Sequence, residues 1–237
     1  MASVIAVLNS KGGTGKTTLA TNLAGWLHHG GHRVLVVDTD PQGSARDWQH
    51  ARPDGVELPA VVAMDRPTIH RDLASVAAPY DYVVIDGAAK LEQVAASALK
   101  ASDLVLIPVQ PSGFDLWAVA DLVDAVRVRQ EVTDGRPRAA FVVSRQVAGT
   151  HLAAEVAEAL AGLGLPVLAG RTSQRVAYAE AAQSGLTVAD YEPEGKAADE
   201  VRAIGEEVLA VLDGRTPIET ESAEGTPTTD ITNPTGP

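Results

Sequence analysis

The chain has no cysteine among its 237 residues, which excludes disulfide bonds, thiolate metal sites and iron–sulfur clusters. Aromatic residues make up only 4% of it, so aliphatic side chains must fill the core. No apolar stretch approaches the roughly 20 residues that a membrane-spanning helix needs, and the first residues lack the pattern of a signal peptide. These absences favour a cytoplasmic protein, and one hydrophobic core is the simplest organisation at this length.

Basic residues are also scarce, since 19 Lys and Arg stand against 31 Asp and Glu, a formal net charge of −12. Residues 216–237 contain four acidic and no basic residues, so residues 1–215 keep a charge of −8. This last segment is rich in Thr, Pro, Glu and Gly, which predicts a disordered tail after a single domain of residues 1–215. It lacks the basic amphipathic character of a membrane-binding helix, so we expect no membrane contact.

The most informative segment that is present spans residues 10–18, Ser-Lys-Gly-Gly-Thr-Gly-Lys-Thr-Thr, between an apolar run and a helical pattern. Glycines let backbone N–H groups converge on phosphate oxygens, and the N-terminus of the following helix adds a favourable dipole. In such a loop Lys16 reaches the β- and γ-phosphates and the Thr17 hydroxyl holds Mg²⁺. The sequence therefore predicts a nucleotide site formed by Gly12, Gly13, Thr14, Gly15, Lys16, Thr17 and Thr18.

Two apolar segments, 34–37 and 82–85, are each followed directly by an acidic residue, Asp38 and Asp86. Continuous apolarity is typical of parallel strands buried on both faces, and ligands bind at the carboxyl ends of such strands. After the first segment, Asp40 is a candidate to orient an attacking water and Asp38 a candidate for an outer Mg²⁺ contact. After the second segment, Asp86 is a candidate to reach Mg²⁺ through water. An ordinary acidic turn explains either segment when it is considered alone.

Apolar strands alternate with helical patterns along the chain, which predicts a doubly wound α/β fold with a mostly parallel sheet and helices on both faces. The expected strands are 4–8, 34–38, 82–86, 104–108 and 139–144, with a short one at 166–169 and a peripheral one near 56–62. The expected helices are 16–29, 69–76, 91–100, 116–130, 152–161, 174–184 and 197–212.

Residues 11–18 resemble the deviant Walker A motif of the ParA/MinD superfamily of P-loop positioning ATPases, and residues 38–42, Asp-Thr-Asp-Pro-Gln, resemble its switch I segment. The resemblance implies an ATP-sandwich homodimer in which Lys11 crosses the interface to the partner's nucleotide. It implies ATP and Mg²⁺ as cofactors, Lys11, Lys16 and Asp40 as catalytic residues, and slow turnover until a partner completes the site. The small residues that follow Asp86 are similar to those of compact plasmid-partition proteins such as ParF.

Residues 185–193 resemble the Gly-Leu-Pro-Val-x-x-Tyr-Asp-Pro stretch of ParA-like chains, which implies that Tyr191 and Pro193 flank the adenine base. Arg145 is a second adenine-side candidate. A turn before the last helix and an exposed arginine at a strand end explain these residues as well. The resemblance also implies non-specific binding to nucleoid DNA, for which an acidic chain needs a local basic face. The candidates for that face are Arg171, Arg175 and Lys196.

The function that these inferences favour is that of a ParA-type ATPase that binds nucleoid DNA and positions a cargo through partner-stimulated ATP hydrolysis. The expected cargo is a plasmid that carries a ParB-like adaptor protein, and a protein microcompartment such as the carboxysome is the alternative. A metabolic ATP-dependent synthetase of the same fold and a filament-forming or membrane-recruited module are further alternatives. Lys11 and residues 38–42 disfavour the synthetase, and the acidic tail disfavours membrane recruitment.

Overall fold

The computed structural model describes residues 1–89, 92–111, 115–147 and 152–215. Within these residues six strands form one sheet in the order β3-β2-β4-β1-β5-β6, and every pairing is parallel. The strands are β1 (Ser3–Val7), β2 (Val34–Asp38), β3 (Ala60–Ala63), β4 (Tyr82–Asp86), β5 (Leu104–Val109) and β6 (Arg138–Val143). The expected disordered tail, residues 216–237, lies outside the described residues.

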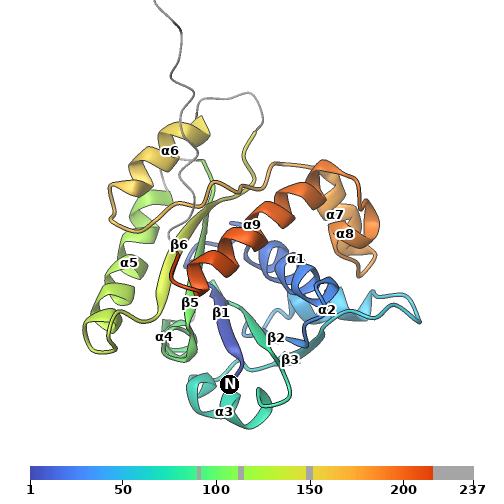
Figure 1. Ribbon diagram of the computed structural model, residues 1–237, viewed down its shortest axis with the longest axis horizontal. Helices are drawn as coiled ribbons and strands as arrows, with labels where there is room; N and C mark the ends of the chain where they lie inside the picture. Colours follow the sequence, from blue (N-terminus) through green and yellow to red (C-terminus); the bar gives the residue numbers. More distant parts are fainter. Residues whose placement is uncertain (90–91, 112–114, 148–151, 216–237) are drawn as a thin grey trace, which may run out of the picture.

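Helices cover both faces of this sheet (Figure 1). Those in the described part of the chain are α1 (Lys16–His29), α2 (Ser44–His50), α3 (Ile69–Val76), α4 (Glu92–Ala101), α5 (Asp115–Glu131), α6 (Leu152–Ala161), α7 (Val176–Gln183), α8 (Val188–Tyr191) and α9 (Lys196–Leu212). None of the helices in the described ranges combines the length and apolarity that a membrane crossing needs.

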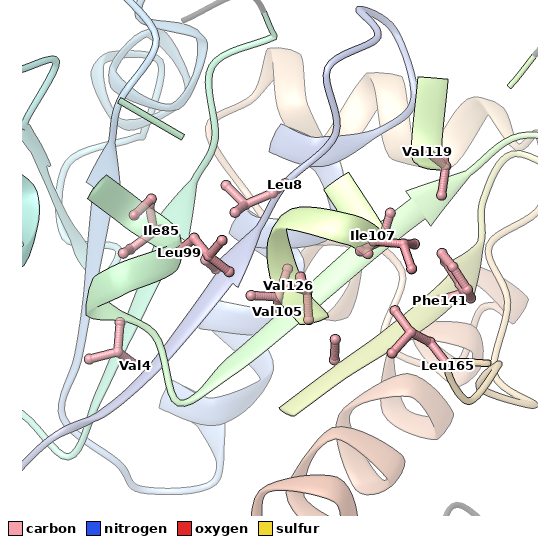
Figure 2. Packing of buried hydrophobic residues seen from close by; sticks show 14 of the residues in the cluster. Val4, Leu8, Ile85, Leu99, Val105, Ile107, Val119, Val126, Phe141 and Leu165 are labelled. Atoms are coloured by element: carbon pink, nitrogen blue, oxygen red, sulfur yellow. The ribbon is translucent and has the colours of Figure 1, made fainter. Parts of the chain in front are cut away.

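The two faces of the sheet belong to two separate hydrophobic cores, because successive side chains of a strand point to opposite faces. Val4 lies in the first core with residues of α3, α4, α5 and α6, whereas Ile5 lies in the second with residues of α1, α2 and α9. Figure 2 shows Val105 of β5 and Val126 of α5 among the members of the first core. The sheet is therefore buried on both sides, as its continuous apolar strands predict.

Most of the predicted elements are confirmed. Strands 34–38 and 82–86 and helices 16–29, 69–76 and 152–161 have the predicted bounds. The other helices and the strands β1, β5 and β6 differ from the prediction by one or two residues at an end. The peripheral strand is shorter than predicted and spans Ala60–Ala63.

The predicted strand at 166–169 is wrong. Val167 makes only an isolated bridge to Phe141 of β6. The N–H of Leu168 still donates to the Phe141 carbonyl at 2.9 Å, but the N–H groups of Ala169 and Gly170 donate to the Glu207 carboxylate instead of a strand. The segment follows β6 without extending the sheet.

Two helices were not predicted. The first, α2, is mostly polar and buries only Ala45 and Trp48, so it has no apolar periodicity to detect. The second, α8, has four residues and begins with a capping box formed by Thr187 and Asp190.

Candidate nucleotide-binding site

The carboxyl ends of β1, β2 and β4 meet at one edge of the sheet. Val7 of β1 and Asp38 of β2 are both register partners of Asp86 on β4. The P-loop, residues 10–18, follows β1 and leads directly into α1. The fold therefore places two carboxylates that are far apart in sequence beside the glycine-rich loop, where open α/β sheets bind ligands.

A cavity of about 480 Å³ lies beside the P-loop, within the usual volume range of small-molecule sites. One part of its lining comes from the P-loop and the residues after β2, namely Gly12, Gly13, Gly15, Lys16, Thr17, Thr18 and Asp40. The other part comes from the end of β6, the segment before α7, and α7 itself, including Ser144, Arg145, Thr172, Ser173, Gln174, Arg175 and Tyr178. The structure thus gathers most of the predicted phosphate-binding residues around one cavity, together with Asp40 and Arg145.

Side chains from the ends of β5 and β6 hold the carbonyl groups of the P-loop. The Gly13 carbonyl accepts hydrogen bonds from Gln110 Nε2 at 2.7 Å and from Arg145 Nη1 at 2.9 Å. The Ser144 hydroxyl donates to the carbonyl of Thr14 at 2.7 Å. These bonds compensate carbonyl oxygens that would otherwise repel an anion, so the loop is arranged to receive phosphate through its N–H groups.

The backbone of this region has special conformations. Gly13 and Gly15 have φ angles of 77° and 87°, in the left-handed region that side chains with a Cβ rarely adopt. Arg145, although not a glycine, also has a positive φ of 53°. Such strain in a residue that holds the loop is typical of functional sites.

Lys16 is almost completely buried, with 7% of its surface exposed. Its Nζ donates to the carbonyl oxygen of Lys11 at 2.8 Å. Burial lowers the pKa of Lys16, and the charges of Asp86 and Asp40 oppose this shift. Lys11 itself is half-buried, its N–H donates to Asn9 Oδ1 at 2.9 Å, and it is not part of the cavity lining.

Asp86 is buried, and neither of its carboxylate oxygens has a hydrogen-bond partner among the described residues. Burial raises the pKa of Asp86 to about 7, with further contributions from Asp38 and Asp40, while the Thr17 hydroxyl and the charge of Lys16 oppose the shift. An unpartnered buried carboxylate is costly, and carboxylate, hydroxyl and water oxygens are the ligands that Mg²⁺ prefers. The residues present therefore fit a Mg²⁺ ion held by Thr17 and reached by Asp86.

Asp38 is equally buried but fully engaged. Its Oδ1 accepts the N–H of Asp40 at 3.0 Å, and its Oδ2 accepts the N–H and the Nε–H of Arg46, each at 3.2 Å. Arg46 Nη2 also donates to the Asp40 carbonyl at 2.9 Å. Asp38 thus holds the turn that presents Asp40 to the cavity, and it is not itself a lining residue. Sequence reasoning missed Arg46, because it lies in the polar helix α2.

The structure does not bring two of the adenine-side candidates to the cavity. Tyr191 is 42% exposed, and its hydroxyl hydrogen bonds with Glu180 Oε2 at 3.0 Å. Neither Tyr191 nor Pro193 is among the lining residues. Tyr178 of α7, which the sequence analysis did not select, is the tyrosine that lines the cavity.

The three DNA candidates have different surroundings. Arg175 lines the cavity and pairs with Glu200 through its Nη2 at 2.7 Å. That pairing removes Arg175 from an open basic surface. Arg171 is half-buried, and Lys196 is exposed at the first position of α9.

Residues 5–188 match the family described as the CobQ/CobB/MinD/ParA nucleotide binding domain. The chain belongs to this family. It is 32% identical over 212 residues to the maintenance of carboxysome distribution protein A of Halothiobacillus neapolitanus, a match that covers 88% of this chain and 97% of the relative. It is also 32% identical over 236 residues to the chromosome-partitioning ATPase Soj of Thermus thermophilus, with coverage of 87% and 95%.

Solved structures have the same fold. Cobyrinic acid a,c-diamide synthase from Mycobacterium smegmatis, with a bound ATP analogue and magnesium, aligns with a TM-score of 0.75 and 22% identity over 93% of this chain and all of that one. A McdA–ATP complex from Cyanothece aligns with a TM-score of 0.70 and 17% identity over 92% of this chain and 99% of that one. At such identities the likeness establishes the doubly wound P-loop architecture.

Proposed function

We propose that this chain is a Mg²⁺-dependent ATPase of the ParA type that dimerises around ATP and positions a cargo in the cell. The observation that carries the proposal is the pair of lysines, Lys11 and Lys16, in a P-loop beside a buried carboxylate that has no hydrogen-bond partner in the described part of the chain. Two relatives aligned over nearly their whole length support it, since one is named for carboxysome distribution and the other for chromosome partitioning.

The chain's own residues account for nucleotide binding and hydrolysis. Lys16 would exchange the Lys11 carbonyl for the β- and γ-phosphates. Thr17 would hold the metal and Asp86 would reach it through water, with Asp38 as an outer contact. Bound Mg²⁺ supplies neutralisation of the charge on the phosphate oxygens. Asp40 lies on the cavity wall, and its Oδ1 accepts the N–H of Gln42 at 2.9 Å. This bond orients the carboxylate, which then accepts a hydrogen bond from the attacking water and directs it.

In the proposed dimer, Lys11 of each subunit neutralises phosphate charge in the other subunit's site. Each site is complete only when a second copy of the chain and an adaptor protein are bound. Turnover is therefore slow until both are present. The dimer acts in the cytoplasm and binds nucleoid DNA without sequence preference. Arg171 and Lys196 are the candidate residues for that contact.

The cargo has two candidates. A protein microcompartment is favoured by two carboxysome-distribution relatives of which the alignments cover 97% and 94%. A plasmid or chromosome with a ParB-like adaptor is favoured by the partition relatives. Deletion of the gene in its host separates them, because loss of plasmid or chromosome inheritance indicates the second cargo and clustering of compartments indicates the first.

The test of the proposal is the Lys11→Ala substitution, with Lys16→Ala as the comparison. With a non-hydrolysable ATP analogue we expect the wild-type protein to elute as a dimer in light-scattering chromatography. Lys11→Ala should remain a monomer and still bind ATP, whereas Lys16→Ala should lose ATP binding. A wild-type protein that stays monomeric with the analogue, or a Lys11→Ala variant that dimerises normally, overturns the positioning mechanism and favours a metabolic enzyme.

DNA binding is tested with random duplex DNA over a salt series. We expect binding with ATP to exceed binding with ADP and to weaken as salt is raised, because phosphate neutralisation releases counterions. Equal binding with the two nucleotides contradicts control of DNA binding by the dimer.

A further inference from the structure

Two glutamates of α9, Glu200 and Glu207, lie seven residues apart and therefore on the same side of the helix. Both carboxylates accept hydrogen bonds from the segment that follows β6. Glu207 accepts the N–H of Ala169 at 2.8 Å and the N–H of Gly170 at 2.6 Å. These two contacts lie outside the cavity lining, so Glu207 is a purely structural anchor of that segment.

Glu200 makes a larger cluster further along the same segment. Its Oε1 accepts hydrogen bonds from Arg175 Nε at 2.9 Å and Nη2 at 2.7 Å. Its Oε2 accepts the N–H of Ser173 and the Tyr178 hydroxyl, each at 3.0 Å. The Glu200 side chain is only 14% exposed. Although burial alone raises the pKa of Glu200, the hydrogen bonds from Arg175, Ser173 and Tyr178 outweigh it and leave the pKa lowered.

All four groups that face Glu200 act as donors, and an ionised carboxylate has only acceptors. A glutamine at this position keeps one oxygen and replaces the other with an NH₂ group. If the oxygen faces Arg175, the NH₂ group opposes the N–H of Ser173; if it faces Ser173, the NH₂ group opposes the guanidinium. A nearly isosteric substitution therefore breaks one side of the cluster while it preserves the volume of the side chain.

The three residues that Glu200 holds all line the cavity on the side contributed by α7 and the segment before it. The P-loop, on the other side, supplies the phosphate-binding groups. Because the P-loop contributes the phosphate-binding groups, the wall that includes Ser173, Arg175 and Tyr178 is the side on which the nucleoside end of the ligand is expected.

We infer that Glu200 is a positioning residue for the nucleoside end of the nucleotide, acting through Ser173, Arg175 and Tyr178. The inference rests on the proposed ATP-binding function and adds a residue that itself lies behind the cavity wall. Without the Glu200 carboxylate the wall has several arrangements. The apparent affinity for the nucleotide then falls in proportion to the fraction of molecules that are in the binding-competent arrangement.

The experiment compares Glu200→Gln with the matched control Glu207→Gln, which breaks the corresponding anchor on the same helix. Dissociation constants are measured for two ligands, MgATP and inorganic triphosphate, which lacks the nucleoside. We expect Glu200→Gln to weaken MgATP binding about tenfold and to leave triphosphate binding within about twofold. In steady-state hydrolysis the KM for ATP should rise by the same factor, while kcat at saturating ATP stays nearly unchanged. Glu207→Gln should alter neither ligand.

Stability is followed in parallel, because both substitutions remove hydrogen bonds from the same segment. Similar losses in Tm for the two variants, with ATP affinity reduced only in Glu200→Gln, support the positioning role. If Glu200→Gln does not fold, Tyr178→Phe removes one hydrogen bond of the cluster and keeps the ring, and we expect a twofold to threefold loss of ATP affinity alone, on the order of a single neutral bond.

The possible failures are distinguishable. Unchanged ATP binding in Glu200→Gln, or an equal loss for ATP and triphosphate, overturns the positioning role. If wild-type protein binds neither ligand, or if Lys16→Ala binds both normally, the proposed nucleotide site itself is wrong.

Discussion

Two strand ends of this protein carry buried carboxylates with opposite surroundings. Asp38 at the end of β2 and Asp86 at the end of β4 are register partners on neighbouring strands, and both are essentially inaccessible to solvent. Asp38 accepts three hydrogen bonds, two of them from Arg46, whereas Asp86 accepts none from the described residues. The same residue type at the same level of one sheet is therefore satisfied by the protein itself in one strand and, among the described residues, left without a hydrogen-bond partner in the next.

The difference shows that a candidate ligand site can be recognised by a buried polar group that lacks hydrogen-bond partners within the protein. A buried carboxylate with partners stabilises the folded chain, while one without partners is retained at a cost unless a cation compensates it. Asp38 orders the turn before α2, and Asp86 is available to the ion that accompanies a nucleotide. Four substitutions test this contrast, beginning with the largest expected effect.

Asp86→Asn should lower the kcat of ATP hydrolysis by about 10²–10³-fold, because it removes the charge that orients the metal and its water. The measurement is phosphate release at saturating MgATP, with circular dichroism as a check of folding. Activity within a few-fold of wild type would mean that Asp86 has no part in the metal site.

Asp38→Asn should lower the free energy of unfolding by about 1–3 kcal/mol, since an amide cannot accept all the hydrogen bonds from Asp40 and Arg46. Urea unfolding without nucleotide and with a chelator measures the effect. In a double-mutant cycle, Asp38→Asn should lower the free energy of unfolding by less in the Arg46→Leu background than in the wild-type background. Additive losses would contradict a direct contribution of this pair.

The pH dependence of stability should differ between wild type and Asp86→Asn. In the metal-free protein the pKa of Asp86 is raised to about 7. The ionised carboxylate therefore destabilises the folded state above pH 7, and this destabilisation disappears as the pH falls through 7 toward 4 and Asp86 becomes protonated. Asp86→Asn lacks this titration. We expect the variant to be more stable than wild type by about 1–3 kcal/mol at pH 8, with an advantage that shrinks by pH 5.

The smallest expected effect on stability comes from Arg33 and Asp81, an ion pair at the opposite ends of β2 and β4. The Asp81 carboxylate accepts hydrogen bonds from the backbone N–H of Arg33 at 2.9 Å and from Arg33 Nη2 at 2.8 Å. Both side chains are well exposed. The hydrogen bonds from the Arg33 side chain and backbone lower the pKa of Asp81 to about 2. Solvent screening limits the benefit, so Asp81→Asn should lower the Tm at pH 7 by only about 1 °C.

The sign of this last effect is opposite to that of Asp86. Stabilisation by Asp81 is fully present above about pH 4 and is lost as the pH falls toward 2. The Tm difference between wild type and Asp81→Asn should therefore shrink in acid. A difference that grows as the pH falls would show that another group is responsible.

Local features of the sequence predicted much of the molecule. The glycine spacing of residues 10–18 is sufficient to indicate a P-loop, because the conformation depends on residues next to one another. Strands 34–38 and 82–86 combine continuous apolarity with a terminal Asp, and their predicted bounds are confirmed.

Features that depend on side-chain contacts of the folded chain were not predicted. The helix α2 has no apolar stripe, and its first turn is held by the bond between Arg46 and Asp38. The far wall of the cavity combines the end of β6 with α7 and is anchored from α9. Tyr191 was selected by resemblance alone; it hydrogen bonds with Glu180 and is not among the residues that line the cavity.

The sequence by itself determined that the chain folds as a parallel α/β sheet with a phosphate loop after its first strand, because apolar periodicity and glycine spacing act over a few neighbouring residues. Only the tertiary structure decided which of the two aspartates lacks a hydrogen-bond partner among the residues that the structure describes, and which tyrosine lines the cavity. The hydrogen-bond partners of Asp38 are close in sequence, but the burial of both aspartates and the far wall of the cavity depend on segments that are distant in sequence, so no local pattern encodes them.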